Sequence, residues 1–242
     1  MRIDGRKVDE LRKVEVKPDY LLYPEGSVLF SMGHTRVICT ATIEDGVPKW
    51  KKDQNLTSGW ITAEYGMLPR STYDRKPREV RGFGGRTHEI KRLIGRSLRA
   101  AVDLEKFGER TCIIDCDVIQ ADGGTRTASI TGGYIALALA LQKLRKENII
   151  PPDTIKTAIA AISVGVVGNV PMLDLCYQED VSADVDVNIV MTSESDFVEV
   201  QSTAEGDPFS RSILVELLDL AYKGIGELIE IQAAFLNNHQ ID

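Results

Sequence analysis

Residues 115–131 read DCDVIQADGGTRTASIT, and this stretch predicts a strand, a tight turn and a helix in immediate succession. The β-branched and apolar residues 111–119 are typical of a strand. The Asp-Gly-Gly sequence at 122–124 favours a turn, because glycine tolerates positive φ and lets another backbone approach closely. The two threonines that follow can cap a helix, and residues 128–146 are rich in helix-forming side chains.

The turn between this strand and this helix has the features of an anion-binding site. Backbone N–H groups at a helix N-terminus are free and the helix dipole is positive there, so both favour a negatively charged ligand. Arg126 follows the glycines and could hold a phosphate through two parallel hydrogen bonds. Glycine turns before helices are common, so the spacing alone leaves open an ordinary corner with a solvated arginine.

The order of predicted elements indicates an α+β fold. A polar loop over residues 70–85 precedes a helix over 87–107, and Pro151 and Pro152 mark a break after the second helix. We expect two β-rich lobes with packed helices, residues 1–150 and residues 151–242. Strands are predicted at 26–31, 36–43, 60–63, 157–166, 172–176, 184–191 and 197–201. A C-terminal helix is predicted at 212–236, and Asp207-Pro208 is expected to start it, because proline is favoured at the beginning of a helix.

The charge of the chain is unevenly distributed. The net charge is −7, but residues 70–99 contain ten basic and three acidic residues and carry +7, which leaves −14 for the rest. Nucleic acid is bound by local basic surfaces rather than by net charge. On one face of the helix over 87–107, Arg92, Arg96 and Arg99 fall near one another. The segment therefore fits RNA binding, and a solvated charged face is the alternative.

Four acidic residues lie between positions 179 and 186. Polar and apolar residues alternate over 184–189, which predicts a strand with one solvent-exposed face. In a fully extended chain Asp180 and Asp186 would lie roughly 20 Å apart. They can share a metal ion only if the chain turns between them, which Ser182 and Ala183 would allow. On the residues alone, an acidic sheet edge that prevents aggregation explains the cluster equally well.

Composition limits the remaining possibilities. Apolar residues make up 43% and charged residues 27%, as in ordinary soluble proteins. The longest apolar run, near residues 130–141, is too short to cross a bilayer, and the N-terminus lacks the apolar core of a signal peptide. We therefore expect a cytoplasmic protein without a membrane partner. The four cysteines lie in apolar runs, which favours buried free thiols over a zinc site.

Several long motifs resemble the bacterial ribonuclease PH family, and they occur in the same chain order. They are GWITAEYGMLPRSTYDR at 59–75, GRTHEIKRLIGRSLRAAVDL at 85–104, the turn segment at 115–131, LDLCYQEDVSADVDVNIVMT at 173–192 and VEVQSTAEGDPFS at 198–210. The resemblance runs from about residue 2 to about residue 226. It implies a ribonuclease PH-type fold, a ring of six identical subunits, and a phosphate-dependent 3′-to-5′ exoribonuclease that trims transfer RNA precursors.

The resemblance also implies roles for individual residues. Arg86, Gly124, Thr125 and Arg126 match the phosphate-binding positions, and Arg70, Arg75 and Arg78 match arginines that grip RNA. Asp180 and Asp186 match the catalytic acids, whereas Asp184 matches a position without that role. We expect both aspartates to bind a divalent cation, most simply Mg²⁺, and inorganic phosphate to be the co-substrate. Asp180 acting as a proton donor is the alternative.

Two positions depart from the family pattern, and two other functions compete with this interpretation. Ser202 stands where glycine is usual, so a glycine-specific φ there would be strained. His34 replaces an Asp or Asn in a turn. Trp60 and Tyr65 could stack on a base, but core packing is favoured for both.

The rival functions are a non-catalytic RNA-binding ring subunit and a small-molecule nucleotide transferase. The intact acids and arginines argue against the first function, and the basic segment argues against the second.

Overall fold

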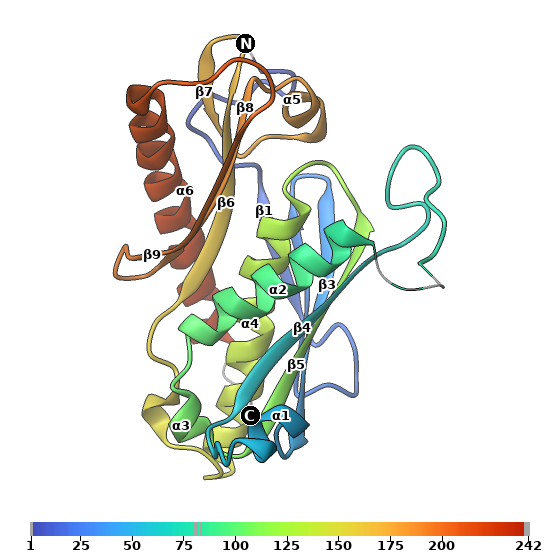
Figure 1. The fold of residues 1–242 in the computed structure, drawn as a ribbon, viewed down its shortest axis with the longest axis vertical. Coiled ribbons are helices and arrows are strands. Elements are labelled where there is room, and N and C mark those ends of the chain that lie inside the picture. The colour runs from blue at the N-terminus through green and yellow to red at the C-terminus, as the bar shows by residue number, and fades with distance from the viewer. Residues whose placement is uncertain (1, 80–81, 83, 240–242) are drawn as a thin grey trace.

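The computed structural model describes residues 2–79, 82 and 84–239 of the 242-residue chain. Two β-sheets form the scaffold, with one long helix between them and others around them (Figure 1). The α+β class expected from the sequence is confirmed. No helix in the described part of the chain is long and apolar enough to cross a membrane.

The first sheet is built around β5 (Arg110–Gln120), the strand that leads into the glycine turn. Its side chains alternate in burial, as they must when one face of a strand covers a core. On one side β5 pairs antiparallel with β3 (Thr35–Asp45), and on the other it pairs parallel with β4 (Trp60–Met67). The outer strands are β2 (Gly26–Met32) and β1 (Val14–Pro18), which gives the order β1-β2-β3-β5-β4.

The second sheet contains four antiparallel strands in the order β7-β6-β8-β9. Its central strand β6 (Ile159–Val167) is buried along almost its whole length, which fits its unbroken run of small and β-branched residues. The neighbouring strands are β7 (Val170–Leu173), β8 (Val185–Thr192) and β9 (Phe197–Ala204).

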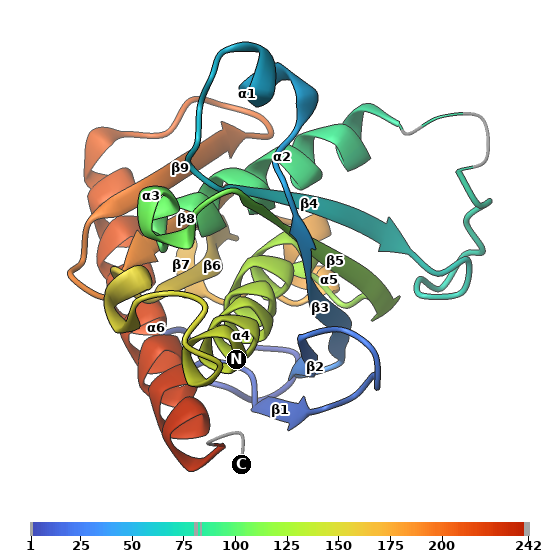
Figure 2. The same ribbon diagram turned by 90° about the horizontal axis from the view of Figure 1, so that it is seen from below.

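A single buried helix joins the two sheets. This helix, α4 (Thr125–Lys146), packs against β2 and β3 of the first sheet and β6 of the second, and Figure 2 shows it between them. Its apolar residues surround the helix instead of forming one stripe, as expected of a helix covered on all sides. The outer helices are α2 (Gly85–Ala100) against β4 and α6 (Arg211–Asn238) against the second sheet.

Three boundaries differ from the sequence-based prediction. The helix expected over 87–107 ends at Ala100, because the Asp103 carboxylate caps a new short helix, α3 (Leu104–Phe107), by accepting from two backbone N–H groups. The strand expected over 172–176 ends at Leu173, because Asp174 has φ +54°. Ser210 caps α6, so Pro208 lies outside that helix.

Four short elements were not predicted. They are β1, α1 (Lys49–Asp53), η1 (Pro152–Thr154) and α5 (Tyr177–Val181). Each is at most five residues long, so hydrophobic periodicity has too few positions to reveal it.

The two positions that depart from the family pattern cause no strain in the described structure. Ser202 lies within β9 opposite Val187 and is not among the residues with positive φ. His34 is exposed in the turn between β2 and β3. All four cysteines are free and buried, which confirms the prediction for them.

Buried arginines tie the N-terminal segment to the second half of the chain. Arg2 makes two hydrogen bonds to the Glu179 carboxylate, at 2.8 and 2.6 Å. Arg12 holds the fully buried Asp174 carboxylate at 3.0 and 2.6 Å and also donates to the carbonyl oxygen of Asp122. Arg12 therefore joins the glycine turn to the segment that leads into α5. The division into lobes at residue 150 stays a prediction.

Replacing Arg12 is expected to destabilise the protein strongly. Arg12→Met leaves the buried Asp174 carboxylate without its main partner, which costs about 3–5 kcal/mol of unfolding free energy. Urea unfolding measures this loss. The control is Lys223→Met, which removes an ion pair to Asp9 of the same 2.6 Å length but on the surface, where it contributes little. Similar losses in the two variants would contradict the expectation.

Candidate active site

The two catalytic-acid candidates lie together because the chain turns between them. Asp180 belongs to α5, which ends at Val181, and a turn through Ser182 and Ala183 leads into β8 and Asp186. Hydrogen bonds from Ser182 N to Glu179 O and from Ala183 N to Asp180 O close this turn. The turn proposed at Ser182 and Ala183 is therefore present, and both carboxylates reach one cavity.

That cavity has a volume of about 260 Å³ and lies where α4, α5, β6 and β8 meet. It opens beside a second hollow that shares four of its lining residues. The predicted site residues that line the first cavity are Arg86, Gly124, Thr125, Arg126, Asp180 and Asp186. The structure thus brings together all six residues named for phosphate and acid roles.

The glycine turn is shaped by contact with the opposite half of the molecule. Gly123 has φ +72°, and a Cβ there would lie 2.5 Å from the carbonyl oxygen of Leu175. Gly124 has φ +64° and is the N-cap of α4. At position 123 only glycine tolerates both the positive φ and the close approach of the Leu175 carbonyl. The turn can therefore pack directly against the segment that leads into α5.

Two of the phosphate-binding candidates, Thr125 and Arg126, are oriented by hydrogen bonds to neighbouring side chains. The Thr125 hydroxyl lies 2.9 Å from the hydroxyl of Tyr65, which is buried. Tyr65 is therefore a packing residue that orients the turn and does not stack on a base here. Arg126 donates from Nη1 to Glu89 at 2.9 Å and to the Gln201 amide oxygen. Among the described residues its Nε and Nη2 have no hydrogen-bond partner, so they can take an incoming anion.

Arg86 approaches the cavity from another helix. It occupies the first turn of α2, whose N-cap is Gly84, and its side chain is exposed. The positive charges of Arg86 and Arg126 both act on Asp180. The N-termini of α2 and α4 thus each present one arginine to the same space, and the first turn of neither helix contains an acidic residue.

Both aspartates are harder to ionise than usual. Burial raises the pKa of Asp180, and the charges of Arg86 and Arg126 act in the opposite direction. Burial, followed by the negative charge of Asp180, raises the pKa of Asp186 to about 6. Perturbed carboxylates in a cavity are typical of functional sites, although ion-pair networks also produce them.

The acidic pair offers carboxylate oxygens that suit a divalent cation. Asp186 Oδ2 accepts a hydrogen bond from Asn188 Nδ2 at 3.1 Å, whereas its buried Oδ1 has no hydrogen-bond partner. No three His, Cys, Asp or Glu side chains within 2–79, 82 and 84–239 form a group that could hold a metal ion. Mg²⁺ usually uses one or two carboxylates together with water and substrate phosphate, so the pair fits this ion.

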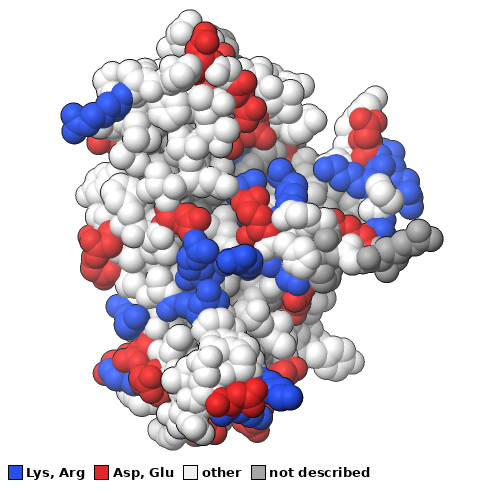
Figure 3. All heavy atoms as spheres, viewed as in Figure 1, with Lys and Arg blue, Asp and Glu red and all other residues white. Residues whose placement is uncertain are grey.

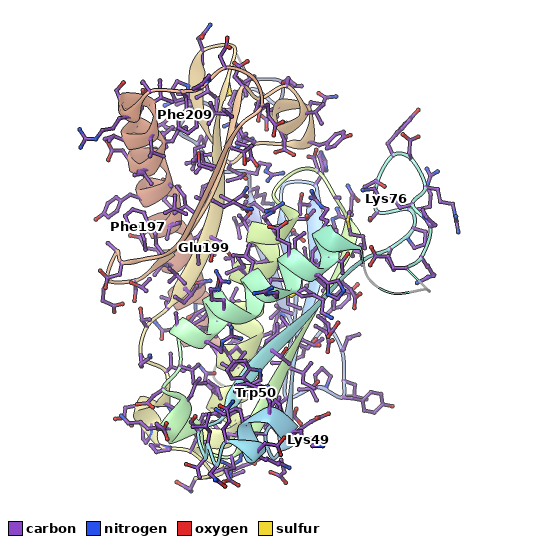
Figure 4. All side chains as sticks on the ribbon, viewed as in Figure 1. Lys49, Trp50, Lys76, Phe197, Glu199 and Phe209 are labelled. Carbon is purple, nitrogen blue, oxygen red and sulfur yellow. The ribbon has the colours of Figure 1, made fainter. Side chains whose placement is uncertain are left out.

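The projecting loop carries the arginines expected to grip RNA. Arg70, Arg75 and Arg78 are exposed and make no hydrogen bond or ion pair to the described residues. None of the three lines the cavity; Thr72 and Lys76 of the same loop do so instead. Figure 4 shows Lys76 on this loop. Arg81, also counted in the basic segment, lies outside the described residues.

A second basic group lies on α2, away from the cavity. Arg92, Arg96 and Arg99 line one hollow, as their helical spacing predicted. The Arg99 guanidinium lies 4.3 Å from the centroid of the Trp60 ring, so Trp60 is held by packing. Figure 3 shows Lys and Arg side chains on the projecting loop and over α2 on the same face. Arg96 pairs with Glu199 of β9 at 2.9 Å, and Figure 4 labels Glu199 on that strand.

Sequence reasoning missed several residues of the site. These are Thr72, Lys76, Ser163, Asn188, Gln201, Thr203 and Glu205. Asn188 could have been found, because it continues the polar face of the strand that carries Asp186. The signal for Ser163 is absent from the sequence, since it is one polar residue inside an apolar strand.

Comparison with known proteins gives a consistent result. Residues 10–141 match the model of the 3′ exoribonuclease family, domain 1, and residues 157–224 match domain 2 of that family. A protein named ribonuclease PH from Bacillus pumilus is 59% identical over 237 residues, which is 97% of each chain. A protein of the same name from Solibacter usitatus is 55% identical over 234 residues, covering 96% of this chain and 98% of its own.

Solved structures share the fold at lower identity. The crystal structure of rice (Oryza sativa) Rrp46 superposes with a TM-score of 0.79 at 18% identity and covers 97% of this chain and 100% of its own. A chain of the Archaeoglobus fulgidus exosome, solved with RNA bound to the active site, gives a TM-score of 0.77 at 24% identity, covering 95% and 91%. At this level of identity the likeness concerns the fold alone.

Proposed function

The chain belongs to the 3′ exoribonuclease family, and we propose that it removes nucleotides from the 3′ ends of transfer RNA precursors by phosphorolysis. One observation carries the proposal: two arginines, a helix N-terminus and two aspartates from separate elements line one cavity. The arginines suit an anionic co-substrate, and the aspartates suit the chemistry at the leaving oxygen.

Phosphorolysis requires an inorganic phosphate to approach a phosphodiester that is itself negative. An oxygen of the phosphate attacks the last phosphorus of the RNA, the bond to the preceding 3′ oxygen breaks, and a nucleoside 5′-diphosphate leaves. Arg86 and Arg126 would neutralise the two anions, with the free N–H groups after Gly124 holding the phosphate in place. Catalysis by such a site consists mainly of positioning and charge stabilisation.

We propose that Asp180 and Asp186 hold a divalent cation, with Mg²⁺ favoured because the ligands are hard oxygens. When bound, it would supply positive charge at the leaving 3′ oxygen. The unpartnered Oδ1 of Asp186 supports this assignment. Asp180 as the proton donor is the second possibility, and complete activity in EDTA would favour it over the metal role.

Product analysis tests the proposed reaction. A transfer RNA with a labelled 3′ extension is expected to give nucleoside 5′-diphosphates when phosphate is present and no nucleotide product when phosphate is removed. The reverse reaction, extension of the RNA from nucleoside diphosphates, should also be measurable. Nucleoside monophosphates as the main product would contradict phosphorolysis.

The exposed arginines of the projecting loop are proposed to bind the RNA backbone. Arg75→Ala and Arg78→Ala are each expected to weaken RNA binding and to reduce the slope of log K against log salt by about one. Filter binding of single-stranded RNA over a salt series measures both effects. Wild-type affinity and slope in both variants would remove this role from the loop.

We also propose that the protein forms a homohexameric ring, built as a trimer of dimers. The similarity over nearly the whole chain to proteins named ribonuclease PH supports this assembly. A ring would gather six basic loops around one RNA path while the acidic remainder of each subunit faces outward. Light scattering at micromolar concentration is expected to give six times the 26.7 kDa chain mass; a monomer would contradict the ring.

A further inference from the structure

Two unpartnered polar atoms face the same cavity. Four buried side-chain atoms in the described residues lack a hydrogen-bond partner, and they belong to Ser71, Ser163, Asp186 and Gln232. Ser163 Oγ and Asp186 Oδ1 both come from residues that line the active-site cavity. A buried polar group without a partner costs about 1–3 kcal/mol, so an unpartnered group at a cavity is explained if a ligand completes it.

The position of Ser163 in the second sheet directs its hydroxyl toward the glycine turn. Ser163 lies in β6 directly opposite Asn188 of β8, and Asp186 is two residues before Asn188. Residues opposite one another, and residues two apart on a strand, share one face of an antiparallel sheet. The Ser163 hydroxyl therefore lies on the face that carries Asp186. Its Oγ is only 3.7 Å from where a Cβ on Gly124 would be.

We propose that the Ser163 hydroxyl donates a hydrogen bond to the inorganic phosphate co-substrate. This inference rests on the proposed phosphate site. The other phosphate-binding candidates lie at the N-termini of α2 and α4, so Ser163 would hold the same anion from the second sheet. A neutral donor suits this place, because a further charge beside Asp186 would alter the balance between the aspartates and the arginines.

The burial of Ser163 indicates which ligand of the site its hydroxyl contacts. Ser163 is 3% exposed, whereas the loop arginines proposed for the RNA backbone are exposed. A hydroxyl is a weak ligand for Mg²⁺ where two carboxylates are available. Phosphate offers several acceptor oxygens and is small enough for the cavity, so it is the ligand that this donor fits.

Ser163→Ala in the full-length protein tests the inference. The expected result is an increase of about 10–100-fold in the KM for phosphate, the scale of a lost hydrogen bond to a charged group, with RNA affinity unchanged. The increase in melting temperature on adding phosphate should shrink in the same variant. Without phosphate, its melting temperature should equal or exceed that of the wild type, because an unpartnered buried hydroxyl has been removed.

Ser97→Ala is the matched control. Ser97 is equally buried, but its hydroxyl donates to the carbonyl oxygen of Leu93 at 2.9 Å within α2. This variant is expected to lose stability and to keep the wild-type KM for phosphate. An unchanged KM in Ser163→Ala, or a change only in the Mg²⁺ requirement, would overturn the inference. If Arg126→Ala also left the KM unchanged, the proposed phosphate site itself would be wrong.

Discussion

Asp186→Asn is expected to reduce turnover by a hundredfold or more while leaving the protein folded and able to bind RNA. The side chain keeps its shape and can still accept from Asn188, but it loses the negative charge that the proposed cation needs. Loss of one acid or one charge-stabilising group commonly costs 10²–10⁴ in rate. Asp180→Asn should have an effect of the same order, because both carboxylates line one cavity.

The same substitution should stabilise the metal-free protein at neutral pH. The pKa of Asp186 is raised to about 6 in the folded state, whereas an unfolded chain ionises it near 3.9. Between these values the folded state holds the proton that the unfolded state has lost, so stability falls as pH rises from about 4 to about 6. Above that range the ionised carboxylate costs roughly 3 kcal/mol, and asparagine avoids this cost.

Thermal unfolding in EDTA measures this stabilisation and shows whether the Asp186→Asn protein is folded. At pH 7 the Asp186→Asn protein should melt at a higher temperature than the wild type, and near pH 4 the difference should disappear. Adding Mg²⁺ should raise the melting temperature of the wild type alone. Asp184→Asn is the control, because Asp184 is exposed beside the same strand and does not line the cavity. Normal turnover in Asp186→Asn would exclude this residue from the mechanism.

The sequence predicted the parts of this site that depend on local chemistry. The glycine turn was predictable because Gly123 and Gly124 adopt positive φ, which few other residues tolerate. The helix α4 was predictable because residues 128–146 are rich in helix-forming side chains, and strand β5 was predictable because residues 111–119 are β-branched and apolar. The proximity of Asp180 and Asp186 depended on one short turn, and the sequence could only say that Ser182 and Ala183 permitted it.

The parts that the sequence did not predict depend on contacts between distant segments. Ser163 belongs to the site because of its register with Asn188, and register is a property of the sheet. Arg12 joins Asp122 to Asp174 across the molecule, and neither partner is near it in the chain. Lys76 lines the cavity in place of the neighbouring arginines, and its backbone N–H donates to the carbonyl oxygen of Pro69 across the loop at 2.9 Å.

Arg126→Ala is expected to reduce kcat/KM for phosphate by about 10²–10³ and to leave RNA affinity in the absence of phosphate unchanged. Arg126 combines a fixed charge, a position in the first turn of α4 and two donor groups without partners in the described residues. Removing one preorganised donor to a developing negative charge costs this much in comparable sites. Arg86→Ala should act in the same direction.

A lysine variant distinguishes the bidentate hydrogen bonding of the Arg126 guanidinium from its positive charge, and an Arg96 variant is the control. Arg126→Lys keeps the charge but cannot make two parallel bonds, so it should restore only part of the activity. Arg96→Ala is the control, because Arg96 also pairs with a glutamate at 2.9 Å but lies on the outer face of α2. It should leave the KM for phosphate unchanged.

The two donor groups of Arg126 that have no partner in the described residues explain why the effect of Arg126→Ala should appear in the KM for phosphate as well as in kcat. Glu89 is a second acceptor for Nη1 of Arg126, together with Gln201, and a bound phosphate must share the guanidinium with both. In Arg126→Ala nothing replaces the two free donors, so phosphate binds more weakly before any bond breaks and is also held less well as it attacks. Steady-state kinetics over a phosphate series at saturating RNA separates the two constants. If the variant lost RNA affinity and kept wild-type phosphate kinetics, Arg126 would bind the RNA. The proposed assignment of phosphate binding to the cavity and of RNA binding to the loop would then be wrong.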